Sequence, residues 1–389
     1  MRDKNGLLCK IALISCGYGI FSDSVIVPIF SRICAEYPDT STFLTNFTLT
    51  GGYIFSLLSS LAAGFLLRYI SKRRLLLFGT ICFTLGGVGA YFTSSMPFLA
   101  FCRILDGISD GVLAVAALSM ITELYQEKAR AQMIGLYSAV SAAFGVLLSF
   151  FSGIIGDHSG NWRTCFLLNL ISIVSIVLVF LAVPETPKEE KENRSSLWSA
   201  FRLSAARRIY IEYFVSSALY CILFVFVDIY VQEKGFGSST LSGTISSLGS
   251  IFTFLAGVAF AAIYIKVKRI VRFSCFLGLG ASFLLLYLSG KVAVSIAAFC
   301  LAAVFYSFLY SYYQMRIGTV APKESLDVHI GVLNAWYNIA CFLSAYIPFA
   351  VMPIMKTAVV YHSFLPFAVF LCLLGVLFAF QLKKEMQTE

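Results

Sequence analysis

The segment Gly64-Phe65-Leu66-Leu67-Arg68-Tyr69-Ile70-Ser71-Lys72-Arg73-Arg74 links two long apolar runs, at 42–67 and 75–95. Each run has about the 20 mainly apolar residues that an α-helix needs to cross a bilayer. Four basic residues in so short a connection are typical of a loop at the cytoplasmic face of a membrane. This stretch therefore predicts two membrane-spanning helices joined by a basic turn.

The same alternation of apolar run and short polar connection continues along the whole chain. Of its 389 residues, 59% are hydrophobic and 13% are charged, whereas soluble domains are roughly 45–50% apolar and about 25% charged. Ordinary soluble enzymes, nucleic-acid-binding proteins and disordered proteins are thereby excluded. Continuous apolar runs also argue against a membrane β-barrel, whose strands alternate polar and apolar residues. Twelve spans are expected, at 8–31, 42–67, 75–95, 97–121, 133–156, 163–183, 209–231, 240–264, 271–289, 292–314, 328–353 and 360–382.

One hydrophilic stretch divides the expected spans into two groups of six. We expect an all-α integral membrane protein with an N-terminal six-helix bundle at 1–183, a cytoplasmic linker at 184–208 and a C-terminal six-helix bundle at 209–389. The linker is expected to hold an amphipathic piece around 197–201.

A weak repeat indicates that the two halves are similar. Ser60-Leu61-Ala62-Ala63-Gly64 of the second span aligns with Thr253-Phe254-Leu255-Ala256-Gly257 of the eighth, and a basic cluster follows each. Two halves related by an axis along the membrane normal are typical of alternating-access transporters, with the substrate site at their interface.

The net charge of +9 reflects topology. When both termini and the even-numbered connections are assigned to one side, that side holds 23 of the 29 basic residues, the opposite side holds 5, and Arg103 lies within a span. By the positive-inside rule both termini are cytoplasmic. We therefore expect a multi-pass protein of the cytoplasmic membrane and no nucleic-acid partner.

The eleven cysteines and three histidines predict neither a disulfide framework nor a metal site. No C-x-x-C pair occurs, and nearly all the cysteines lie within apolar runs, where a free cysteine packs as a small hydrophobe. No metal and no cofactor are expected.

With these features the chain resembles the major facilitator superfamily, most closely its bacterial twelve-span drug:proton antiporter-like branch. The family's loop after the second helix reads G-x-L-x-D-R-x-G-R-R. Here Gly64, Leu66 and the basic cluster Lys72-Arg73-Arg74 match this pattern, whereas Arg68 replaces the family Asp and Ser71 replaces the second Gly. In the family that Asp helps to lock the two halves together on the cytoplasmic side, so the replacement puts the lock in doubt.

The fourth and fifth spans carry the rest of the resemblance. The family has an Arg followed four residues later by Gly, as in Arg103-Ile104-Leu105-Asp106-Gly107. The resemblance implies that Arg103 takes part in proton coupling or in cavity electrostatics. The fifth span of antiporters carries G-P-x-x-G-G, but Leu148-Ser149-Phe150-Phe151-Ser152-Gly153 lacks the Gly-Pro pair. That departure weakens the assignment to the antiporter branch.

Charges inside a span are costly and usually face a cavity or a partner. Asp23 lies about 22 Å from the cytoplasmic end of the first span and Arg103 about 9 Å from the outer end of the fourth, which are similar depths. The resemblance implies that these two helices lie close together, so an Asp23–Arg103 ion pair is expected. Arg103, Asp106 and Asp110 lie broadly on one helical face, and two carboxylates so close should not both ionise, so one of them would carry a transported proton. The alternative is a static Arg103–Asp106 pair that fixes helix packing.

Two further acidic residues, Glu212 and Asp228, bracket the seventh span. Because both sit near helix ends, we expect their side chains to be solvated. Asp228 could alternatively reach the outer mouth of the cavity.

Aromatic and amide side chains are the candidates for substrate contact. Tyr306, Tyr310 and Tyr313 lie at i, i+4 and i+7 of the tenth span, which lines the cavity in the family that the chain resembles. Tyrosine offers an apolar face and a hydroxyl, which suit amphiphilic or cationic substrates; simple helix packing is the alternative. The candidate substrate-binding set also includes Tyr220 and Phe224 of the seventh span and Asn334 and Asn338 of the eleventh. The two asparagines could instead bond across helices.

The resemblance implies a secondary transporter that moves a small organic molecule by alternating access. An enzyme is not expected: Asp106 and Asp110 lie on one helix, whereas an intramembrane aspartyl protease needs them on facing helices. No P-loop occurs, so ATP-driven transport by this chain alone is not expected either. Proton-coupled export of a drug-like or amphiphilic compound is favoured. The alternative is proton-coupled or facilitated uptake of a small metabolite, such as a sugar or an organic acid. The expected partners are the substrate, protons and the lipid bilayer, and a monomer is expected.

Overall fold

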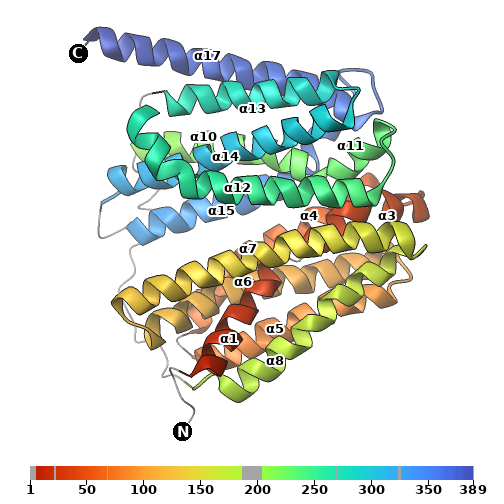
Figure 1. The fold of residues 1–389 in the computed structure, drawn as a ribbon, viewed down its shortest axis with the longest axis vertical. Coiled ribbons are helices and arrows are strands. Elements are labelled where there is room, and N and C mark those ends of the chain that lie inside the picture. The colour runs from red at the N-terminus through yellow and green to blue at the C-terminus, as the bar shows by residue number, and fades with distance from the viewer. Residues whose placement is uncertain are drawn as a thin grey trace. The chain divides into compact units, whose positions relative to one another are not determined.

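The computed structural model describes residues 6–21, 23–67, 69–185, 204–267, 270–322 and 326–388, and within these ranges every regular element is a helix (Figure 1). The α-helices are α1 (Leu7–Ser15), α2 (Asp23–Ile26), α3 (Phe30–Glu36), α4 (Thr42–Leu66), α5 (Lys72–Gly89), α6 (Met96–Leu124), α7 (Glu127–His158), α8 (Ile171–Ala182), α10 (Ser204–Val225), α11 (Val227–Glu233), α12 (Ser239–Val267), α13 (Val271–Leu288), α14 (Val292–Val320), α15 (Leu326–Ser344), α16 (Ile347–Val351) and α17 (Phe364–Thr388). Short 3₁₀ segments are η1 (Cys16–Phe21), η2 (Val27–Ile29), η3 (Ala90–Phe92), η4 (Trp162–Leu170) and η6 (Val360–Ser363).

The chain divides into two compact units. The first comprises Met1–Asn193 together with Ser238–Thr244, and the second comprises Arg194–Gly237 and Ile245–Glu389. The principal boundary falls within the stretch that the sequence predicts to be a linker. The amphipathic piece expected at 197–201 lies outside the described residues. The linker was expected to end at 208, whereas helix α10 already begins at Ser204, because the basic residues at its start do not interrupt the helix.

Among the described residues, ten helices are long and apolar enough to cross a membrane, and the bent pair Leu7–Gly19 and Asp23–Glu36 supplies an eleventh span if the pair is counted as one. The expected eleventh span, 328–353, corresponds to α15 and α16 and does not pass the same test. The break between Ser344 and Ile347 leaves one piece of 19 residues and one of 5 residues. Polar residues within α15, such as Asn334 and Asn338, lower its apolar character further.

Three of the expected spans are broken rather than continuous. The first passes from α1 through η1, α2 and η2 to α3, with a bend of 50° between its two main pieces. The seventh is interrupted at Phe226, whose backbone (φ −101°, ψ 14°) departs from α-helical values. The third break lies between α15 and α16, where Pro348 is near the start of the new helix and cannot donate a backbone hydrogen bond.

Small residues bring α4 and α6 together in the first unit. A Cβ added to Gly107 would come within 2.2 Å of the Gly52 carbonyl oxygen, and one added to Gly111 within 2.1 Å of the Ser56 carbonyl oxygen. Close approach of backbones at small residues is a usual way for membrane helices to associate without a hydrophobic driving force between them. α6 also packs against α5, so α6 is the central helix of this unit (Figure 1).

In the second unit α13 packs beside α17 and α14, and α10 packs against α15 and α14 (Figure 1). Aromatic rings fill many of these contacts. The Phe283 and Phe364 ring centroids are 5.4 Å apart, and those of Phe276 and Phe378 are 5.1 Å apart, both in edge-to-face geometry, which is the favoured arrangement for aromatic pairs. The result is a core of rings on the α13 side and, on the α10 side, the tyrosine cluster described below.

Candidate functional site

A buried ion cluster lies between the first span and α6 in the first unit. The Arg103 guanidinium donates to the Asp106 carboxylate at 2.6 Å and also contacts the Asp23 carboxylate. The Arg103 and Asp106 side chains are each 1% exposed. The ion pair expected between Asp23 and Arg103 is therefore present, and so is the Arg103–Asp106 pair. One cation holds two carboxylates, so the Asp23–Arg103–Asp106 cluster has one negative charge when both acids are ionised.

Asp106 and Asp110 do not share one environment. The Ser56 hydroxyl of α4 donates to Asp110 Oδ2 at 2.6 Å. Asp106 Oδ1 instead lies against α5, where a Cβ on Gly86 would come within 2.6 Å of it. The two carboxylates thus have different hydrogen-bond partners: the Arg103 guanidinium for Asp106 and the Ser56 hydroxyl for Asp110.

The ion cluster retains hydrogen-bonding capacity. Arg103 Nε, Asp106 Oδ1 and the Ser109 hydroxyl are buried and have no hydrogen-bond partner among the described residues. Buried polar atoms without a partner are unusual in folded proteins, and three of them lie on two turns of α6.

A tyrosine cluster joins α10 to α14 in the second unit. The Tyr220 and Tyr306 rings stack with centroids 4.0 Å apart and planes 8° from parallel. The Tyr306 and Ser217 hydroxyls lie 3.1 Å apart, and Tyr220 reaches Thr253 of α12 at 3.5 Å. The two expected candidates Tyr220 and Tyr306 therefore lie in direct contact with each other.

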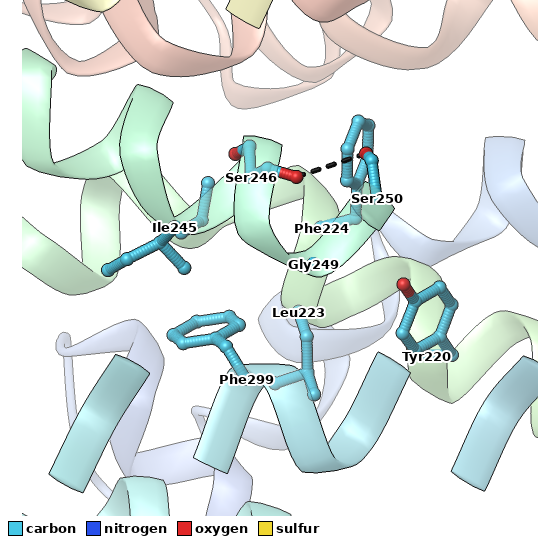
Figure 2. A pocket seen from close by; sticks show the side chains of 9 residues that line it. Tyr220, Leu223, Phe224, Ile245, Ser246, Gly249, Ser250 and Phe299 are labelled. Carbon is cyan, nitrogen blue, oxygen red and sulfur yellow. Dashed lines mark hydrogen bonds between the residues drawn. The ribbon is translucent and has the colours of Figure 1, made fainter. Parts of the chain in front are cut away.

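A pocket adjoins this cluster between α10, α12 and α14 (Figure 2). About 320 Å³ of space lies between its lining atoms, part of it open to solvent. Its lining is Tyr220, Leu223, Phe224, Val227, Ile245, Ser246, Gly249, Ser250 and Phe299. None of these side chains is charged, so the pocket offers apolar surface and hydroxyl groups.

One hydroxyl of the pocket lacks a partner. Ser246 is 6% exposed, and its Oγ makes no hydrogen bond to any described residue. One turn further along α12, the Ser250 hydroxyl donates to the Ser246 carbonyl at 3.0 Å, as Figure 2 shows. Ser246 is therefore the lining residue with a hydroxyl available to a bound molecule.

The remaining substrate-binding candidates do not line this pocket. Tyr313 is buried and donates to Glu212 Oε2 at 3.0 Å. Tyr310 is 39% exposed and lies against Tyr213, with ring centroids 6.0 Å apart. The Asn338 amide donates to the backbone carbonyl of Asn334 within α15 at 2.9 Å, rather than to another helix.

The two acidic residues of the seventh span are not solvated. Asp228 is fully buried in α11, which continues the span beyond Phe226. Glu212 is mostly buried and accepts from Arg272 and Arg208 as well as from Tyr313. The expectation of solvated side chains was wrong because helices α10 and α11 extend past both ends of the predicted span.

The basic loop after α4 ties the first unit together. Lys72 pairs with Glu123 of α6 at 2.5 Å, and Arg73 donates to the Phe180 carbonyl of α8 at 2.6 Å. Arg74 lies 3.3 Å from Glu185. Gly64 lies in the last turn of α4, and Arg68 falls outside the described residues. The Ser71 hydroxyl, which donates to Glu185 at 2.8 Å, and then Arg74 and Arg73 hold the pKa of that carboxyl below its usual range.

Sequence reasoning missed Ser56 and the whole α12 side of the pocket. Ser246, Gly249 and Ser250 lie at helical spacing in a run of small and polar residues, 242–250, within an otherwise apolar span. Such a run was the available signal. It is ambiguous because most serines in membrane helices bond to a carbonyl of their own helix, as Ser242 and Ser250 do here.

Comparisons with known proteins agree with this fold. The family model described as Major Facilitator Superfamily matches residues 12–345. The arabinose-proton symporter of Escherichia coli (strain K12) is 31% identical over 106 residues, which are 27% of this chain and 22% of that protein. Multidrug resistance protein Stp of Mycobacterium tuberculosis (strain CDC 1551 / Oshkosh) is 27% identical over 168 residues, 41% of this chain and 30% of that protein. The matches thus span between a fifth and a third of these relatives' lengths.

Among solved structures, the inward-facing and occupied form of a bacterial homolog of the human lysosomal transporter Spinster superposes with a TM-score of 0.78. The match covers 96% of both chains at 13% identity, so it shows the fold alone. Together, the helical architecture and the family match over most of the chain assign it to a family of membrane transporters and not of enzymes. The chain belongs to the major facilitator superfamily.

Proposed function

We propose that this transporter exchanges protons for an amphiphilic, drug-like compound and moves that compound out of the cell. The observation that carries the proposal is the separation of tasks between two buried regions: a charged one in the first unit and an uncharged, aromatic one in the second. Multidrug resistance proteins among the relatives support export. We place the chain in the cytoplasmic membrane with both termini inside, on the strength of its basic loops.

Asp110 is the residue that we assign to the proton. Arg103 bonds to both Asp23 and Asp106, whereas the hydrogen-bond partner of Asp110 is the uncharged Ser56. A carboxylate without a cation is costly inside a membrane protein, which favours its protonation. A serine hydroxyl both donates and accepts, so Ser56 can donate to the carboxylate and accept from the carboxylic acid. The pair therefore suits either protonation state.

The pocket beside Tyr220 is the region that we assign to the substrate. Its apolar walls and aromatic rings favour a molecule with a flat apolar body, and the Ser246 and Tyr220 hydroxyls provide one or two polar contacts. A few well-placed polar groups in an apolar pocket are the usual arrangement of small-molecule sites.

A second function has one specific observation in its favour. The hydroxyl groups of Tyr220, Ser246 and Ser250 would also suit the hydroxyls of a sugar, and an arabinose-proton symporter is among the relatives. Uptake of a sugar together with protons is therefore the alternative. The two functions differ in the direction in which the substrate moves relative to the proton.

Everted and right-side-out membrane vesicles with an imposed pH gradient separate the two functions. We expect ethidium to accumulate in everted vesicles when their interior is acidic, and radiolabelled arabinose not to accumulate in right-side-out vesicles under an inward proton gradient. Arabinose accumulation without ethidium transport would overturn export in favour of uptake.

Asp110→Asn tests the assigned proton site in the same vesicles. Its amide oxygen can still accept from Ser56, so we expect normal expression. Ethidium transport should fall about a hundredfold or more, the lower end of the usual contribution of a positioned acid–base group. Asp39→Asn is the matched control, because Asp39 is exposed in a loop, and it should transport as the unchanged protein does. Equal transport by the two variants would remove Asp110 from the mechanism.

A further inference from the structure

Two buried cysteines of the second unit lie with their sulfur atoms in contact. Cys221 is on α10 and Cys341 is on α15, and their Sγ atoms are 2.7 Å apart. They are 4% and 0% exposed. The two residues are separated by 120 positions in the chain, so the packing of α10 against α15, and not local sequence, brings them together.

The geometry is close to that of a disulfide. A disulfide needs a bond of about 2.03–2.05 Å between the sulfurs, and it forms without backbone movement only where the two side chains already point at each other. Here the two Sγ atoms are 2.7 Å apart, so closure requires them to approach by about 0.7 Å, on that bond length.

The pair lies next to the breaks in both helices. Cys221 is four residues before the end of α10 at Val225, and Cys341 is three residues before the end of α15 at Ser344. A covalent bond here would join the two helices within one turn of the points where each changes direction. It would also fix Tyr220, the neighbour of Cys221 that lines the pocket.

We propose that Cys221 and Cys341 form a redox-active pair whose oxidation to a disulfide ties α10 to α15 beside these breaks. The reaction needs a two-electron oxidant, such as a membrane-permeant azodicarboxamide. One thiolate adds to the N=N bond, and the second thiolate attacks the sulfur of this adduct. The S–S bond forms as the S–N bond breaks, and the two thiol protons and two electrons leave with the reagent as its hydrazine. A dithiol reductant reverses the reaction.

This proposal is independent of the substrate and of the direction of transport. The simpler interpretation is that both thiols pack as small hydrophobes. The two interpretations differ in one measurable respect, because hydrophobic packing predicts that both thiols remain free after oxidation.

The test treats the full-length protein in membranes with diamide, quenches with acid, denatures the protein and alkylates the remaining thiols with iodoacetamide. We expect peptide mass spectrometry to find the Cys221 and Cys341 peptides joined, with a mass lower by two hydrogen atoms than their sum. Cys275, a buried cysteine of α13, should stay alkylated as an internal control. Alkylation of Cys221 and Cys341 to the same extent as Cys275 would overturn the proposal.

Variants and a stability measurement complete the test. In Cys341→Ser and in Cys341→Ala, the Cys221 thiol should stay free after diamide treatment and be alkylated afterwards. Two different substitutions are used in case one of them impairs folding. The unfolding temperature of the oxidised protein, followed by tryptophan fluorescence, should exceed that of the reduced protein, because a cross-link over a long loop restricts the unfolded chain. That increase should vanish on addition of dithiothreitol and be absent from both variants. A rise of equal size in Cys341→Ala would show that another modification causes it.

Discussion

The second and fourth spans of each unit meet in two different ways. In the first unit, α4 and α6 approach so closely that a Cβ on Gly107 or Gly111 would strike backbone atoms of Gly52 or Ser56. In the second unit, rings separate the corresponding helices α12 and α14: Phe260 faces Phe308 with centroids 5.9 Å apart, and Tyr264 faces Tyr312 at 6.4 Å. A Cβ on Gly257 would meet the Ser307 hydroxyl only at 3.6 Å, an ordinary contact.

The close helix pair of the first unit encloses buried charged residues, whereas the wider pair of the second unit borders a pocket. The close α4–α6 contact excludes open volume and surrounds Arg103 and Asp110 with fixed neighbours. The wider α12–α14 contact leaves room for the pocket that Ser246 and Phe299 line. Two halves of similar helical plan thus have different interiors, since small residues dominate one contact and aromatic residues the other.

Among the variants considered, removal of Arg103 should lower the free energy of unfolding most. Arg103→Met leaves Asp23 and Asp106 without a cation, and loss of one partner of a buried ion pair costs about 3–5 kcal/mol. We expect a fall of this size in the free energy of unfolding in mixed micelles, together with a low yield. Arg103→Lys should retain part of the lost stability, because it keeps the charge but loses the two-pronged geometry.

A compensated variant distinguishes charge from shape. Arg103→Met combined with Asp23→Asn and Asp106→Asn removes the unpaired carboxylates, and it should recover stability relative to Arg103→Met alone. If Arg103→Met unfolds under the same conditions as the unchanged protein, the cluster is not an electrostatic element and the contrast between the two units fails.

Substitution of Gly107 and of Gly257 compares directly how closely the two helix pairs pack. Gly107→Ala places a methyl group against the Gly52 backbone, and overpacking of this kind costs about 1–3 kcal/mol. Gly257→Ala has only an ordinary contact with Ser307 and should change stability by less than about 0.5 kcal/mol. The free energies of unfolding of the two variants should be measured side by side. Similar values for both would show that the α4–α6 contact is no tighter than its counterpart.

Two substitutions of Tyr306 separate the contribution of its hydroxyl to stability from that of its ring. Tyr306→Phe keeps the ring on Tyr220 and loses the contact with the Ser217 hydroxyl, which is worth about 0.5–1.5 kcal/mol. Tyr306→Leu also loses the ring stack, a further roughly 0.5–1.5 kcal/mol. Thermal unfolding should be measured for both variants. Equal unfolding temperatures would show that ring stacking does not stabilise the packing of α10 against α14.

The smallest effect is expected at the exposed end of the basic loop. Ser71, Arg74 and Arg73 lower the pKa of Glu185 in the folded protein, so its carboxylate adds stability above the ordinary glutamate pKa and loses it as the pH falls through the folded value. Glu185→Gln should therefore unfold slightly earlier than the unchanged protein at pH 7 and identically in strong acid. A difference in stability between Glu185→Gln and the unchanged protein that grows as the pH falls would contradict a lowered pKa of Glu185.

Much of the helical plan can be predicted from the sequence because charged and turn residues end the apolar runs. The Asp23–Arg103 pair was also within reach, since counting residues along two helices gives their depths. The separation of Asp106 from Asp110 was not predictable. A spacing of four residues places both broadly on one face of α6, and only the positions of Gly86 and Ser56 on neighbouring helices show that the carboxylates point apart.

The pocket was predicted only on its α10 side. Tyr220 and Phe224 stand out as aromatic residues one turn apart, whereas Ser246 resembles the many serines whose hydroxyls bond to their own helix. What distinguishes Ser246 is the missing partner, a property of three-dimensional packing and not of spacing. Asp228 illustrates the opposite error, because its burial depends on α11 continuing beyond the break at Phe226.

The Arg103–Asp106 pair has a consequence for biosynthesis. A membrane helix enters the bilayer from the translocon, where one charged residue at the helix centre adds about 2.5–3.5 kcal/mol to the cost of insertion. Arg103 and Asp106 are three residues apart and bond within the same helix, so α6 carries its own counter-ion as it leaves the ribosome. Its insertion then does not have to wait for Asp23 of the first span, and that contact can form later, when the inserted helices assemble.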